Sequence, residues 1–73
     1  MMTLKELASV FDEEQELQIF DWKNNQKYLG CYDGKTETLD NKYMNWKVVK
    51  IAPYEQEIGT EHWAVLRVLI AED

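Results

Sequence analysis

Apolar residues recur along this chain with two different periods, and each period predicts a different kind of element. Near the start, four apolar residues follow the spacing i, i+3, i+4 and i+7 of one helical face: Leu4, Leu7, Ala8 and Phe11. Thr3 precedes this face, and Glu6 follows three positions later, which is the pattern of a capping box. The two signals together predict a short helix over about residues 4–11.

Strand-like segments rich in β-branched and aromatic residues occupy the rest of the chain, at residues 17–22, 26–32, 47–54 and 62–70. The last of them is apolar on both faces, which suits a central strand or one that a partner covers. On one face it carries His62 with Leu66, and on the other it carries Trp63 with Arg67.

Polar segments connect these strands. An Asn pair near residue 25 predicts a hairpin turn, because Asn tolerates positive φ. Tyr28, Gly30 and Tyr32 are expected to share one face of the second strand, with a bulge or close packing at the glycine. Residues 35–46 form either one helical turn or a loop held by its apolar side chains. Residues 55–60 are expected to be a polar connection that turns at Gly59, and Pro53 marks a strand end or an edge position.

The order of elements predicts an α+β fold, in which a short N-terminal helix packs on a four-stranded, mainly antiparallel sheet. With 73 residues, the chain is expected to form a single small domain over residues 1–73.

Charge and composition exclude several classes of function. The net charge of −6 and the eight scattered lysines and arginines argue against direct binding to nucleic acid or to an anionic membrane. No apolar stretch approaches the roughly 20 residues of a membrane span, and the start of the chain does not resemble a signal peptide. A single cysteine excludes an internal disulfide. We therefore expect a cytoplasmic protein.

Catalytic chemistry has few candidate residues. One cysteine and one histidine, far apart in the sequence, do not make a zinc site, and no phosphate-binding glycine loop is present, so we expect neither metal nor cofactor. Cys31 and His62 could pair as nucleophile and base only if their strands met. The alternatives are a buried Cys31 that fills space and a His62 that begins a strand. We expect no enzymatic activity.

Two sets of side chains are candidate binding residues. An aromatic and arginine set can stack a base or anchor a protein partner: Trp63, Arg67, Trp46, Tyr28 and Tyr32. An acidic set can present one negative surface that mimics a phosphate backbone: Asp12, Glu13, Glu14, Glu16, Glu55, Glu57 and Glu61. The alternatives are that the aromatic residues fill the core and that the acidic residues are simply solvated.

The segments "MTLKELASVF", "QELQIFDW", "KYLGCYDGK", "WKVVKI" and "VLRVLI" together resemble small acidic proteins encoded by phages and prophages of Gram-positive, often gut, bacteria. The resemblance implies a non-enzymatic protein that occupies a host protein surface in the host cytoplasm, plausible in counter-defence as an anti-CRISPR-like inhibitor. Alternatives are sequestration of a small nucleotide signal at the aromatic and arginine set, or a structural or assembly role in the virion. Because short chains bury little surface alone, a homodimer is also expected.

Overall fold

The computed structural model describes residues 2–11, 15–33 and 39–72. In chain order its elements are α1 (Leu4–Ala8), β1 (Leu17–Asp21), β2 (Lys27–Tyr32), the 3-10 turn η1 (Asn41–Asn45), β3 (Lys47–Ile58) and β4 (Glu61–Ala71). The strands form one sheet in the order β2-β1-β4-β3. The β1–β4 pair is parallel, whereas the β1–β2 and β3–β4 pairs are antiparallel. The predicted α+β fold with a mainly antiparallel sheet is confirmed, and the fourth strand is central as expected.

The N-terminal helix begins at the predicted capping box. Thr3 accepts the Glu6 N–H at 3.2 Å, and the Glu6 carboxylate accepts the Thr3 N–H at 3.0 Å. The helix ends at Ala8, three residues before the predicted end. The Ser9 hydroxyl donates to the Glu6 carbonyl at 2.7 Å, and this local bond competes with continued helix. Phe11 still packs against the core, so the apolar spacing survives the shorter helix.

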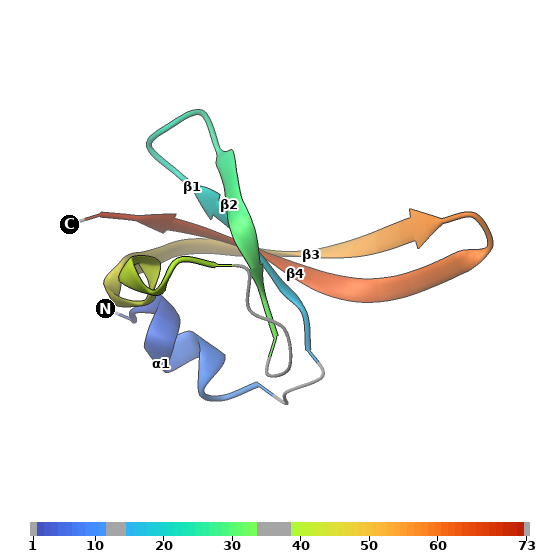
Figure 1. The fold of residues 1–73 in the computed structure, drawn as a ribbon, viewed down its shortest axis with the longest axis horizontal. Coiled ribbons are helices and arrows are strands. Elements are labelled where there is room, and N and C mark those ends of the chain that lie inside the picture. Colours follow the sequence, from blue (N-terminus) through green and yellow to red (C-terminus); the bar gives the residue numbers. More distant parts are fainter. Residues whose placement is uncertain (1, 12–14, 34–38, 73) are drawn as a thin grey trace.

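The core lies between α1 and one face of the sheet (Figure 1). Its buried members come from the helix, from the segment before η1, and from the two central strands: Leu4, Leu7, Leu39, Leu17, Ile19, Val68 and Ile70. Backbone hydrogen bonds from Leu4 to the Trp46 carbonyl and from Val48 to the Met2 carbonyl, both 2.9 Å, fasten the helix to the start of β3. We call this face of the sheet the helix face and the opposite one the open face. No helix in the described ranges is long and apolar enough to cross a membrane.

The hairpin of β3 and β4 is longer than predicted. Residues 55–58 continue β3 instead of forming a polar connection, and the turn consists of Gly59 and Thr60 alone. Gly59 has φ 62, as the first central residue of a tight II′-type hairpin turn requires. β1 pairs with β4 only from Leu66 onward. The end of the hairpin, residues 55–64, therefore projects as a two-stranded ribbon, which we call the arm (Figure 1).

Two bulges determine which side chains reach the open face. In β2 the register shifts at Leu29, so that Gly30 pairs with Ile19 and Tyr28 pairs with Phe20. The predicted bulge near Gly30 is confirmed, but Tyr28 does not share a face with Tyr32, because the extra residue reverses the alternation. In β3 a second shift lies between Val48 and Lys50.

Candidate binding sites

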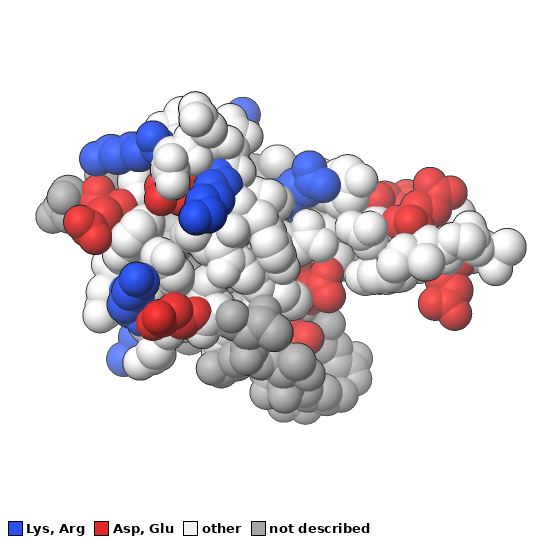
Figure 2. All heavy atoms as spheres, turned by 45° about the horizontal axis from the view of Figure 1, so that its top comes forward, with Lys and Arg blue, Asp and Glu red and all other residues white. Residues whose placement is uncertain are grey.

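The arm is the most exposed regular element among the described residues. All of its residues are exposed except Gln56, and Ile58 retains 64% of its accessible surface. It contains Glu55, Glu57 and Glu61 but no lysine or arginine, so it carries half of the chain's net charge of −6 when His62 is neutral. Figure 2 shows these acidic groups gathered at the projecting end, whereas the visible basic side chains lie over the wider body. Glu55 and Glu57 share one face of the arm, whereas Glu61 lies opposite Ile58 on the other face, so the three acidic residues lie on one projecting element but not on one face.

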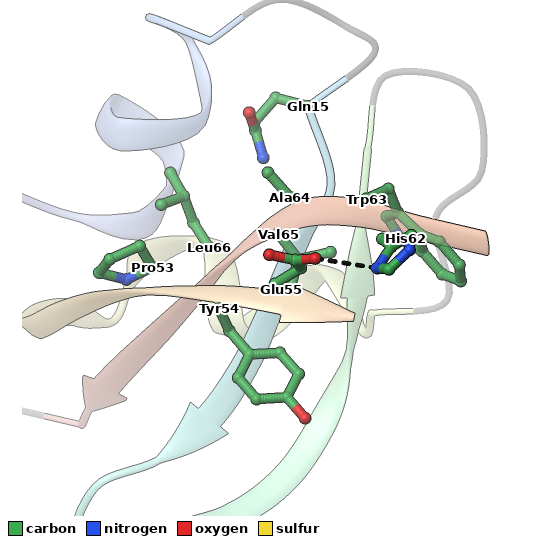
Figure 3. A pocket seen from close by; sticks show the side chains of 9 residues that line it. All are labelled: Gln15, Pro53, Tyr54, Glu55, His62, Trp63, Ala64, Val65 and Leu66. Atoms are coloured by element: carbon green, nitrogen blue, oxygen red, sulfur yellow. Dashed lines mark ion pairs between the residues drawn. The ribbon is translucent and has the colours of Figure 1, made fainter. Parts of the chain in front are cut away.

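A cavity of about 530 Å³ lies at the base of the arm (Figure 3). Gln15 flanks it from the segment before β1, and residues of β3 and β4 complete the lining: Pro53, Tyr54, Glu55, His62, Trp63, Ala64, Val65 and Leu66. His62 Nδ1 lies 3.0 Å from Glu55 Oε1 and 3.8 Å from Glu57 Oε1. These side chains are more than half exposed, so their pairing adds little stability. Among the described residues, the lining of the cavity is mainly apolar, and Glu55, paired with His62, is its one acidic residue.

The candidate pair Cys31 and His62 is not brought into one site. Cys31 lies opposite Gln18 in the β1–β2 pair, whereas His62 lies opposite Glu57 in the arm, on strand β4 beyond its contact with β1. Burial, together with the negative charges of Glu16 and Asp33, raises the pKa of the Cys31 thiol to about 11. A nucleophilic cysteine needs the opposite shift, toward a thiolate at neutral pH.

Three possible metal ligands do meet beside Cys31. Single ligand atoms of Glu16, Cys31 and Asp33 lie within 4.8 Å of one another. Two carboxylate oxygens and a sulfur would suit a divalent cation only after the thiol loses its proton. The raised pKa of Cys31 opposes that step at neutral pH.

Arg67 occupies the centre of the open face. Its guanidinium carbon lies 3.6 Å from the centroid of the Tyr54 ring and 5.6 Å from that of Phe20. The Phe20 ring also contacts Tyr28, with centroids 5.4 Å apart. The sequence pattern placed Arg67 with Tyr28 and Tyr54 among the aromatic candidates but missed Phe20, because only the strand register brings the Phe20 ring to Arg67.

The other predicted residues lie elsewhere. Trp46 and Tyr32 pack against the core on the helix face, where Trp46 meets Tyr43 edge-on at 4.7 Å. Trp63 shares the open face with Arg67 but belongs to the arm, opposite Gln56. Glu16 lies beside Cys31 and not on the arm. The remaining acidic candidates lie outside the described residues: Asp12, Glu13 and Glu14.

Comparisons of the chain with protein-family models, with curated proteins and with solved structures each find no match. Functional inference therefore depends on the arm, the cavity at its base and the open face.

Proposed function

We propose that the chain is a non-enzymatic binding protein of phage or prophage origin, which docks its arm on a basic surface of a host protein in counter-defence. The observation that carries this proposal is the arm itself. Ten residues project as an exposed ribbon that holds three carboxylates, no cation, and the exposed side chains of Ile58 and Trp63.

The physical argument begins with stability. A two-stranded ribbon is marginally stable in water, and most of the arm makes no contribution to the core. Trp63 keeps 37% of its surface exposed, and exposed tryptophan is characteristic of residues that dominate binding energy at interfaces. Trp63 and Ile58 share one face of the arm with Glu61, and this combination fits a partner with a hollow whose rim is basic.

The charge of the arm also affects how fast the arm and its partner associate. Carboxylates on one projecting element attract a cationic surface during encounter and raise the association rate. Glu55 and Glu57 project from the same side of β3, about 7 Å apart. Glu61 faces the other side of the arm, so a cationic groove that surrounds the ribbon would meet all three carboxylates.

Capture from the lysate of a Gram-positive gut bacterium, followed by mass spectrometry, tests the proposal. Two matched variants make the test specific, since Glu61→Lys reverses a charge on the arm and Glu72→Lys reverses one on the exposed residue that follows β4. We expect the wild type and the Glu72→Lys variant to retain the same host protein, and the Glu61→Lys variant to lose it.

The dependence on salt provides a second criterion. Exposed charges are screened within about 10 Å at 0.1 M salt, so retention should fall as salt rises. A host protein retained equally by both variants at all salt concentrations would refute docking by the arm. Selective capture of a virion protein would instead support the assembly role.

A further inference from the structure

The open face of the sheet contains a second cavity, of about 240 Å³, separate from the arm. Four elements supply its lining, namely β1, the β1–β2 turn, β3 and β4. The lining residues are Phe20, Trp22, Gln26, Lys50, Ala52, Arg67 and Leu69. They include two aromatic rings, two cations and no acidic residue.

Both cations are available to a ligand. Among the described residues, neither Lys50 nor Arg67 forms an ion pair. This is notable in a chain with 14 acidic residues and eight lysines and arginines. Two positive charges that converge on one concavity without a carboxylate make a site for an anion.

The backbone directs these side chains into the cavity. Because of the bulge in β3, Lys50 pairs with Leu69 and projects from the open face; regular pairing would place Val49 there instead. Ala52 pairs with Arg67, and its small side chain leaves space above the sheet. The bulge in β2 brings Tyr28 against Phe20 and supports that ring from the other side.

Arg67 is held in position before any ligand arrives. Its guanidinium stacks on Tyr54 at 3.6 Å and also faces Phe20. Its Nε atom is buried and has no hydrogen-bond partner. An unpaired buried donor is unfavourable for folding, so the position of Arg67 lowers the stability of the fold. Packing alone does not explain why a charged side chain is held there. A fixed guanidinium loses less freedom when it binds an anion.

We propose that this cavity binds a free mononucleotide, with the phosphate at Lys50 and Arg67 and the base stacked on Trp22. Trp22 keeps 42% of its surface exposed, which leaves room for a planar ring. Stacking of a base on an aromatic side chain typically strengthens binding by about tenfold or more. A volume of about 240 Å³ is below the usual range for drug-sized ligands, so we expect a single nucleotide rather than a dinucleotide, with part of that nucleotide exposed to solvent. The net charge of −6 disfavours a polyanion.

Isothermal titration at low salt tests the site with adenosine, cytidine, guanosine and uridine monophosphates. Inorganic phosphate and adenosine serve as probes for each half of the ligand alone. We expect at least one monophosphate to bind at least tenfold more tightly than either half. Shifts of the Trp22 indole N–H in an NMR spectrum should accompany that binding.

Variants separate the site from a general attraction between charges. Lys50→Gln should weaken binding about fivefold, which corresponds to roughly 1 kcal/mol, while Lys5→Gln on α1 should not change it. Trp22→Ala should weaken it about tenfold. Both Lys50 and Trp22 are exposed, so these variants do not threaten the fold.

Several results would overturn the assignment. One is the absence of any heat of binding when a monophosphate is titrated to millimolar concentration. Others are equal affinities for inorganic phosphate and for the monophosphate, or an affinity that Lys50→Gln leaves unchanged. Tighter binding of a short single-stranded DNA than of any monophosphate would overturn the assignment to a free nucleotide.

Discussion

Removal of the arm should leave the fold intact. Replacing residues 55–64 with Asn-Gly joins Tyr54 to Val65, which already face each other across the hairpin. A two-residue Asn-Gly connection is a favoured turn for that pairing. Every buried apolar residue lies outside the deleted segment, so the core keeps all of its members.

The expected change in stability is small because the contributions oppose each other. The deletion removes four cross-strand pairs, which together contribute roughly 1–4 kcal/mol. It also removes a long hydrogen bond of 3.5 Å from Gln18 to Gln56. Against these losses, eight fewer residues need to be ordered, and this saving in conformational entropy opposes the loss of the cross-strand pairs. We expect the free energy of unfolding to stay within about 1.5 kcal/mol of that of the full chain.

Urea unfolding followed by tryptophan fluorescence measures this change, with Ile19→Ala as the comparison. Ile19 is fully buried, and the substitution should cost about 2–5 kcal/mol. A domain of this size unfolds with roughly 4–11 kcal/mol, so both changes are measurable. If the truncated protein were unfolded, or lost as much stability as Ile19→Ala, the arm would be part of the cooperative core and the reasoning would be wrong.

Four further predictions concern the helix cap, the Glu6 carboxyl, the Cys31 thiol and the oligomeric state. Thr3→Ala should lower the unfolding free energy by about 1 kcal/mol in urea titrations, because it removes the helix cap, and an unchanged midpoint would contradict the capping box. The hydrogen bonds from Thr3 lower the pKa of the Glu6 carboxyl, so titration of this carboxyl by NMR should show a midpoint below 4.5. The contribution of Glu6 to stability is therefore present above pH 4.5 and is lost as the pH falls through the lower pKa of the folded state. Alkylation of Cys31 should be slow at pH 8 and accelerate toward pH 11. The unfolded thiol ionises near pH 9.0 while the folded thiol stays neutral up to about pH 11, so the free energy of unfolding should fall between pH 9.0 and pH 11. Rapid labelling at pH 7 would contradict this environment of the thiol. Light scattering at high concentration should show a homodimer, and a strict monomer would refute that expectation.

The local elements of this fold are legible in the sequence, because each has its own chemical signal. The cap at Thr3, the helical stripe, the turn at Asn25 with φ 53 and the bulge at Gly30 all appear where the pattern predicts them. The β3 half of the arm was missed because residues 55–60 are mostly polar, and a ribbon exposed on both faces has the composition of a connection.

The open face could not be predicted for a different reason. Its cluster depends on strand order and on two bulges, neither of which leaves a periodic signal. Arg67 meets Phe20 only because β1 runs parallel beside β4, and Lys50 faces the cavity only because β3 bulges at Val49. Pro53 lies on the outer strand β3, as an edge position requires, since it cannot donate a ladder hydrogen bond.

The most direct test of docking by the arm is the affinity of the captured host protein for the full chain and for the truncated chain that lacks residues 55–64. The account predicts a loss of at least 100-fold on truncation, with the fold unchanged by circular dichroism, because the acidic groups and Trp63 leave together. Equal affinities of the two folded proteins would contradict the account and move the interface to another part of the chain.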